Sequence, residues 1–281
     1  MTSTHEYKPL RYFAIIFAAT FGLWFGGAWA SFNNPSLYML FMLPGLMAPF
    51  LVSMVMVMAS GDRSLKREFV NRLYSLNRID PRNVPAFFLV MPLAVIASIA
   101  ISLPFGGSTA QFHLAEEFSF STGMVPVFLL LFLAASFEEL GWRGYAFDSL
   151  QTRLGTFRAT LLFGVLWSLW HLPLLFVKDS YQYVILQESV WYALNFFIGI
   201  VPLGVIITWI CMKNGKSVAW TILFHFVVNI SQEALSMTQS TKCIETVVLA
   251  VMAAGIVMLD KETFGLSIGG PARRRLAGAV A

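Results

Sequence analysis

Residues 124–144, MVPVFLLLFLAASFEELGWRG, join an uncharged apolar run directly to Glu138, Glu139 and Arg143. An apolar run of this kind favours a membrane-spanning helix. An ionisable side chain inside a membrane costs several kcal/mol unless it is paired or hydrated. These charged residues are therefore predicted to meet other polar groups and to mark a functional site.

The composition of the whole chain is that of a membrane protein. Of its 281 residues, 57% are hydrophobic and only 12% are charged, whereas soluble domains are typically about 25% charged. We expect an all-α, polytopic fold, because a helix satisfies its own backbone hydrogen bonds inside a bilayer. The two cysteines, Cys211 and Cys243, indicate neither a disulfide framework nor a metal-binding pair.

Apolar segments long enough to cross a membrane recur along the chain. A spanning helix needs about 20 mainly apolar residues. Eight segments meet or nearly meet this length: 12–32, 38–60, 85–105, 124–143, 159–177, 190–212, 218–233 and 244–260. The fourth and seventh cross the membrane only if their polar residues lie inside it, which makes both of them candidates for the functional site.

The lysines and arginines are distributed unevenly among the connections. If the N-terminus is cytoplasmic, all but two of the 19 basic residues lie on the cytoplasmic side, and only Lys178 and Lys242 face outward. Cytoplasmic connections are typically enriched in lysine and arginine, so this pattern predicts eight helices with both termini in the cytoplasm. The net charge of +4 then reflects topology, and we expect no nucleic-acid partner.

The chain is expected to form a single transmembrane catalytic domain. This domain spans 1–281. Within it we distinguish a motif core at 138–229, a cytoplasmic basic loop at 61–84 and a mobile tail at 265–281. In the basic loop, Leu65, Phe69 and Leu73 share one helical face. This pattern fits a helix lying on an anionic membrane surface, and it fits a solvated loop helix equally well.

Few polar residues interrupt the predicted spans, and those few lie at similar depths. A helix rises about 1.5 Å per residue, so Glu138 lies about 21 Å into a core of about 30 Å, near its cytoplasmic face. His171 belongs to the fifth predicted helix, while His225 and Asn229 share one face of the seventh. We expect the three helices to pack with these groups together, because mutual contact satisfies them at the least cost.

The two adjacent glutamates have different expected surroundings. Glu139 and Arg143 are four residues apart, so an ion pair along one helix face is predicted. Glu138 points about 100° away and has no predicted partner in its own helix. Two structural interpretations stay open, namely an ion pair that only stabilises the helix end and histidines that only form hydrogen bonds between helices.

The polar residues have the chemistry needed to hydrolyse an acyl bond. A desolvated carboxylate beside a histidine can hold and deprotonate a water molecule, which suits Glu138 with His171. A histidine and an asparagine one turn apart can both donate to a tetrahedral oxyanion, which suits His225 with Asn229. This combination predicts direct attack by water, without a covalent intermediate.

Other intramembrane chemistries find less support in the sequence. None of the four histidines has a second histidine four residues later, so the HExxH signature of zinc proteases is absent. The sequence also lacks GxSG and GxGD elements. We therefore expect no cofactor and no metal, with zinc held by a glutamate and two histidines as the minor alternative.

Three motifs follow one another on consecutive apolar blocks. EELGWR at Glu138–Arg143 matches EExxxR, WSLWH at Trp167–His171 resembles FxxxH, and HFVVN at His225–Asn229 matches HxxxN. In this order they resemble the CPBP family of membrane proteins, which includes the type II CAAX prenyl endopeptidases. Trp167 stands where the motif has phenylalanine, and we interpret it as an aromatic wall of the site.

The resemblance implies an intramembrane glutamate endopeptidase. In such an enzyme the first glutamate and the second-motif histidine activate water, while the third-motif histidine and asparagine form the oxyanion hole. The implied catalytic residues are Glu138, His171, His225 and Asn229, and the implied supporting or substrate-binding residues are Glu139, Arg143 and Trp167.

The resemblance also implies a substrate and a location. The substrate is a prenylated protein or peptide ending in a CAAX sequence, from which the last three residues are released. The lipid bilayer of the cell membrane or endoplasmic reticulum surrounds the protein, with the site near the cytoplasmic face. A bacteriocin-immunity or non-proteolytic scaffold protein of the same family stays an alternative. A transporter is a further alternative, although the sequence lacks a pair of broken helices in two matching halves.

Overall fold

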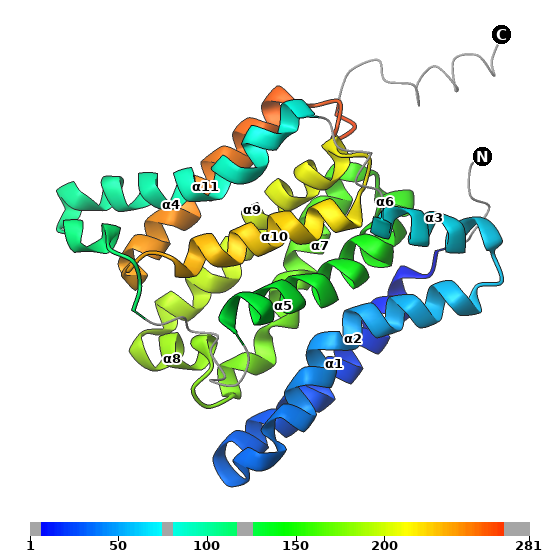
Figure 1. Cartoon of the computed structure of the whole chain (residues 1–281), viewed down its shortest axis with the longest axis horizontal. Coiled ribbons are helices and arrows are strands. Elements are labelled where there is room, and N and C mark those ends of the chain that lie inside the picture. The colour runs from blue at the N-terminus through cyan, green and yellow to red at the C-terminus, as the bar shows by residue number, and fades with distance from the viewer. Residues whose placement is uncertain (1–6, 75–80, 117–125, 267–281) are drawn as a thin grey trace.

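The computed structural model describes residues 7–74, 81–116 and 126–266, and this part of the chain is helical throughout, without a β-strand (Figure 1). The predicted all-α class is confirmed. The helices are α1 Pro9–Asn33, α2 Tyr38–Ala59, α3 Arg63–Tyr74, α4 Val84–Ser102, α5 Val127–Gly141, α6 Phe147–Leu154, α7 Thr156–Trp170, α8 Tyr181–Glu188, α9 Val190–Lys213, α10 Val218–Glu233 and α11 Gln239–Leu259. Almost all of the predicted mobile tail at 265–281 lies outside the described residues.

Six stretches of the described chain are long and apolar enough to cross a membrane. They are Pro9–Asn33, Pro35–Ala59, Pro81–Phe105, Thr156–Phe176, Val190–Lys213 and Gln239–Leu259. These correspond to six of the eight predicted spans. The fourth and seventh predicted spans form α5 and α10, which have only 15 and 16 residues. The described residues therefore contain six candidate spans, and the count of eight stays a prediction.

The two shorter helices lie at the centre of the bundle. Figure 1 shows α5 and α10 side by side, with the α1–α2 hairpin along one side of the molecule and α4 with α11 along the other. Helix α5 packs between α2 and α10, and α10 also contacts α4 and α9. Because the polar residues of α5 and α10 face other helices instead of lipid, their cost in a membrane is reduced.

A close approach of α2 fixes the C-terminal end of α5. A Cβ atom at Gly141 would lie 2.3 Å from the Pro49 carbonyl carbon, so only glycine fits this contact. The Ser53 hydroxyl donates to the Leu140 carbonyl at 3.2 Å across the same interface. Directly afterwards, residues Trp142–Ala146 form a single π-helical turn, a local widening that is frequent at functional sites.

Helix α3 corrects an expectation about the basic loop. Leu65 and Phe69 are buried, and Leu73 packs against the same core. The helix contacts α10 and the π turn, and a Cβ atom at Gly144 would meet the Phe69 ring at 2.8 Å. The apolar face of α3 therefore covers the protein's own bundle and is turned neither to lipid nor to solvent.

A buried ionic cluster holds α3, α6 and the segment before α10 together. Arg72 donates to Asp148 at 2.5 Å and Lys216 donates to the same carboxylate at 2.7 Å. Arg72 also donates to the carbonyl of Arg143 at 2.7 Å, within the π turn. Burial by itself raises the pKa of Asp148, but the charges of Arg72 and Lys216 outweigh burial and lower it below its ordinary value.

Replacing Asp148 by asparagine is expected to destabilise the protein by about 3–5 kcal/mol, because it leaves Arg72 buried without its counter-charge. The folded pKa of Asp148 lies below its ordinary 3.8, so this stabilisation is present above that pH and is lost as the pH falls through the folded pKa. Thermal unfolding in detergent should show a lower Tm for Asp148→Asn at pH 7 and a smaller difference in strongly acidic buffer. The exposed Glu188→Gln on α8 serves as control, and equal Tm values for Asp148→Asn and the unmodified protein would contradict the prediction.

Candidate active site

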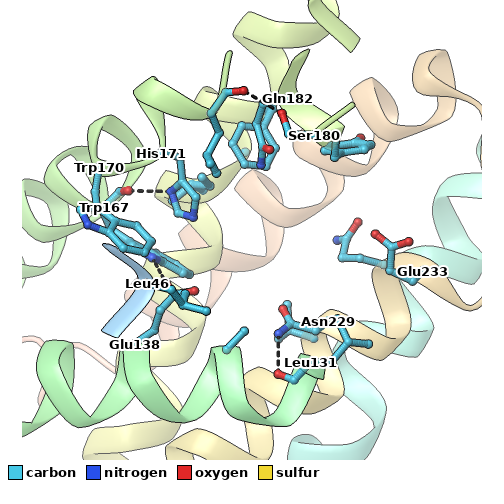
Figure 2. Close-up of a pocket in the computed structure, with 18 of the residues that line it drawn as sticks. Leu46, Leu131, Glu138, Trp167, Trp170, His171, Ser180, Gln182, Asn229 and Glu233 are labelled. Carbon is cyan, nitrogen blue, oxygen red and sulfur yellow. Dashed lines mark hydrogen bonds between the residues drawn. The ribbon is translucent and has the colours of Figure 1, made fainter. Parts of the chain in front are cut away.

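The predicted catalytic residues line one cavity between the helices. The cavity has a volume of about 460 Å³, and its wall includes Glu138, His171, His225 and Asn229. Glu138 comes from α5, His171 from the end of α7, and the other two from α10. Figure 2 shows Glu138, His171 and Asn229 around one open space. The expected convergence of three helices is therefore present in the structure.

Glu138 is held by two tryptophan side chains. Its Oε2 accepts a hydrogen bond from Trp167 Nε1 at 2.7 Å (Figure 2) and another from Trp142 Nε1 at 3.3 Å. Trp142 lies four residues further along the same chain segment, so the expectation that Glu138 has no partner of its own is wrong. Within the described part of the chain, both donors use Oε2 and no side chain donates to Oε1, which is left to contact a ligand or water.

His171 occupies the cap position where α7 ends. The predicted helix at 159–177 instead stops at Trp170, and Leu172–Phe176 form a 3₁₀ turn, because Pro173 lacks the N–H that would continue an α-helix. His171 Nδ1 lies 2.9 Å from the Trp167 carbonyl oxygen. A carbonyl can only accept, so this bond assigns the proton of the neutral ring to Nδ1 and leaves Nε2 as an acceptor.

Glu139 connects the first motif to the third. Its Oε1 accepts from Arg143 at 3.0 Å, which confirms the predicted ion pair, and it lies 2.8 Å from Nδ1 of His225 on α10. Glu139 and Arg143 are almost completely buried, with exposed fractions of 0% and 1%. Neither residue is part of the cavity wall, so their placement favours supporting His225 over contacting a substrate.

Asn229 faces the cavity one turn beyond His225. Its Nδ2 donates to the Leu131 carbonyl of α5 at 3.3 Å (Figure 2). An amide nitrogen has two hydrogens, so this contact orients the side chain and leaves a second hydrogen for another acceptor. The two α10 residues are thus held from α5, His225 by a carboxylate and Asn229 by a backbone carbonyl.

The structure adds to the site two polar residues, Trp142 and Glu245, that were not predicted from the sequence. Trp142 donates to Glu138, and its spacing of four residues from Glu138 indicates contact on one helix face. Glu245 on α11 is buried, lines the cavity and accepts from Gln232 Nε2 at 2.7 Å. An ionisable residue inside the eighth predicted span was a signal of the same kind as Glu138.

The arrangement of metal-ligand side chains bears on the zinc alternative. Across residues 7–74, 81–116 and 126–266, no group of three or more histidine, cysteine, aspartate or glutamate side chains is placed to hold a metal ion. Beside His171 and His225 in the cavity wall, Glu138 Oε2 is engaged by the two indoles. The metal-free site stays a prediction, which sensitivity to a chelator tests.

Comparison with known proteins identifies the family. A family model described as type II CAAX prenyl endopeptidase Rce1-like matches residues 119–231, which include all three motifs. CAAX prenyl protease 2 of Methanococcus maripaludis is 53% identical over 271 residues, covering 96% of this chain and 100% of that relative. The chain belongs to the type II CAAX prenyl endopeptidase family. The resemblance inferred from the motifs is confirmed.

Membership of the type II CAAX prenyl endopeptidase family makes this chain a protease. A more distant relative is lysostaphin resistance protein A of Staphylococcus haemolyticus, 21% identical over 215 residues. That alignment covers 76% of this chain and 55% of the relative. The apolar helices of this chain and its family together support the conclusion that it is an integral membrane protein.

Trp167→Phe restores the phenylalanine of the FxxxH motif and removes the N–H that donates to Glu138. A hydrogen bond to a charged group contributes about 1.5–3 kcal/mol, so we expect kcat to fall by about 10- to 100-fold. KM should change little, because the aromatic ring and its stacking on Phe163 are kept. Peptide-cleavage kinetics measure both constants. Unchanged kcat in Trp167→Phe would show that the indole serves only as an aromatic wall.

Proposed function

We propose that this protein is an intramembrane endopeptidase that cleaves prenylated proteins ending in a CAAX sequence and releases the terminal tripeptide. The observation that carries the proposal is the meeting of Glu138, His171, His225 and Asn229 on one cavity. The name of the Methanococcus maripaludis relative supports the choice of substrate. The proposal that the cleaved bond is a peptide bond rests on the ability of the four side chains to hydrolyse an acyl group.

Glu138 and His171 activate water in this proposal. Glu138 Oε1 and His171 Nε2 are the two acceptors left open by the contacts of the other atoms. A water held between them transfers a proton to Glu138 while its oxygen bonds to the carbonyl carbon of the scissile peptide. When the tetrahedral intermediate collapses, the C–N bond breaks, and the same proton passes from Glu138 to the departing amine.

His225 and Asn229 stabilise the negative charge on the carbonyl oxygen. Glu139 lies on Nδ1 of His225, and a carboxylate in that position stabilises an imidazolium whose Nε2–H faces the other way. The Asn229 amide supplies the second donor. Two donors fixed before the reaction begins can stabilise an oxyanion strongly in a site that excludes water. Glu139 and Arg143 act as positioning residues, not as groups that contact the substrate.

The prenyl chain enters between α2 and α5. Met39 and Leu43 of α2 and Leu133 of α5 line the cavity and are also exposed, with fractions of 41%, 43% and 36%. The cavity therefore reaches the outer surface of the bundle along an apolar seam, where lipid surrounds the protein. An isoprenoid chain gains about 0.8 kcal/mol for each buried CH₂ group, so such a seam holds it while the peptide tail occupies the polar interior.

We further propose that α5 and α10 also cross the membrane, giving eight spans with both termini in the cytoplasm and the catalytic residues nearer the cytoplasmic face. The uneven distribution of lysine and arginine supports this orientation. Single cysteines introduced at Arg67 and Lys178, in a variant without the native cysteines, test it. An impermeant thiol reagent applied to intact cells should label position 178 only, and labelling of position 67 alone would reverse the topology.

A peptide-cleavage assay tests the proposed function. Purified protein in detergent is incubated with a farnesylated peptide ending in CAAX and with its unprenylated counterpart, and the tripeptide is measured by mass spectrometry. We expect tripeptide from the farnesylated peptide and no effect of a chelator. Loss of activity with chelator and recovery with zinc would overturn the metal-free mechanism. A folded protein that releases no tripeptide would instead favour the immunity or scaffold function.

A further inference from the structure

The cavity continues beyond the catalytic residues into a second, polar region. From Asn229 its wall follows α10 to Gln232 and crosses to Glu245 and Lys242 near the start of α11. Gln232 and Glu245 are joined by the 2.7 Å hydrogen bond between the two helices. The proposed chemistry needs none of these groups. A polar extension of an otherwise apolar cavity indicates recognition of a polar part of the substrate.

Lys242 is the cation of this region. Among the described residues it is the only lysine or arginine that lines the cavity. Its Nζ lies 4.7 Å from the centre of the Tyr181 ring, and the Tyr181 hydroxyl donates to Gln239 at 3.0 Å, which fixes the ring. In the described structure no carboxylate lies within the 4.0 Å of an ion pair with Lys242. The ammonium is thus positioned by an aromatic face and left open to an anion.

Helix rise gives an approximate separation along the bundle between the catalytic residues and Lys242, on the scale of a short peptide. From the middle of the His225–Asn229 turn to Gln232 is about 7.5 Å of helix rise. Lys242 precedes Glu245, the partner of Gln232, by three residues of α11, or about 4.5 Å further out. The separation along the bundle is therefore about 12 Å before the reach of the lysine side chain is subtracted. Three extended residues span about 10 Å.

We propose that Lys242 binds the free C-terminal carboxylate of the substrate and so fixes the length of the released peptide at three residues. The inference rests on the proposed function and adds a specificity-determining residue to it. When the carboxylate contacts Lys242, the bond three residues earlier lies at Glu138 and the oxyanion donors. A chain that continues past the third residue has no charge to offer at this position.

Neighbouring carboxylates restrict the position at which the substrate's C-terminal carboxylate can bind. Asp179, Glu233 and Glu245 also line the cavity, and each of them disfavours a second negative charge nearby. A substrate carboxylate displaced from Lys242 would lose the single cation among the described residues of the cavity wall while the acidic groups still surround it. Specificity of this kind comes from repulsion at the wrong position as well as attraction at the right one.

The test compares two farnesylated peptides, one with a free C-terminal carboxylate and one with a carboxamide, on unmodified protein and on Lys242→Met. We expect kcat/KM of the unmodified protein to be about 10- to 100-fold higher for the free acid, as for other interactions with a charged group, mainly through KM. In Lys242→Met this preference should disappear. Lys242→Arg should keep part of it.

Lys178→Met is the matched control, because Lys178 lies at the same end of the bundle but does not line the cavity, and it should keep the full preference. Equal cleavage of acid and amide by the unmodified protein would overturn the assignment, whatever the Lys242 variants do. An undiminished preference in folded Lys242→Met would overturn it as well. If the unmodified protein cleaves neither peptide, the proposed function itself is refuted and this inference with it.

Discussion

Glu138→Gln is expected to lower kcat for tripeptide release by about 100- to 10,000-fold, the usual contribution of a general base. Glutamine keeps the length of the side chain, and its amide oxygen can still accept from the Trp167 and Trp142 indoles. It cannot take a proton from water. The protein should therefore bind the farnesylated peptide with similar affinity and unfold at a similar temperature while losing turnover, which mass spectrometry of the released tripeptide measures.

The adjacent substitution, Glu139→Gln, separates the two glutamates. Glu139 has an exposed fraction of 0% and is shared by Arg143 and His225. Removing its charge leaves a buried guanidinium without compensation, which costs about 3–5 kcal/mol. We expect a clear fall in Tm for Glu139→Gln and none for Glu138→Gln. The reverse pattern, with Glu139→Gln stable but inactive and Glu138→Gln active, would exchange the proposed roles.

Asn229→Ala should produce the second large effect, a fall in kcat of about 100- to 1,000-fold. The amide is proposed to donate to an oxygen that becomes negative only in the transition state, so its loss slows the reaction without weakening substrate binding. His225→Ala should act in the same direction. Initial rates over a range of peptide concentrations separate kcat from KM, and both variants should keep KM within a few-fold of the unmodified protein.

Asn33→Ala is the control for the asparagine substitution. Asn33 is exposed at the end of α1, where its side chain contacts only the local Trp29 carbonyl among the described residues, and turnover should be unchanged. A rise in KM with normal kcat in Asn229→Ala would mean that the amide binds the ground state of the peptide. The oxyanion role would then be wrong.

The location of the site could be predicted from the sequence because charge inside an apolar helix is expensive. Glu138, His171 and His225 are polar exceptions in segments that are otherwise apolar, and mutual contact is the cheapest arrangement for them. The i, i+4 ion pair of Glu139 with Arg143 followed from helix geometry alone. The sequence could not show that Glu139 also contacts His225 of another helix, because a pair with Arg143 at a helix end needs no third partner.

Other features depend on tertiary contacts that leave weak signals in a sequence. Trp142 and Trp167 count as hydrophobic in any composition, yet their N–H groups determine how Glu138 is held. The face of α3 was correctly identified as apolar, but a pattern cannot distinguish lipid from protein as its partner. Helix α5 ends at the π turn that begins at Trp142, where α2 and α3 closely approach the glycines at 141 and 144.

The π turn also sets the rotation of the segment that follows it. It contains one residue more than an α-helical turn requires, and each residue rotates a helix by about 100°. Without the π turn, a regular α-helix with the same number of residues would rotate Asp148 relative to Glu138 and turn its carboxylate away from Arg72. The rotational phase between Glu138 and the ionic anchor at Asp148 therefore depends on the π turn between them.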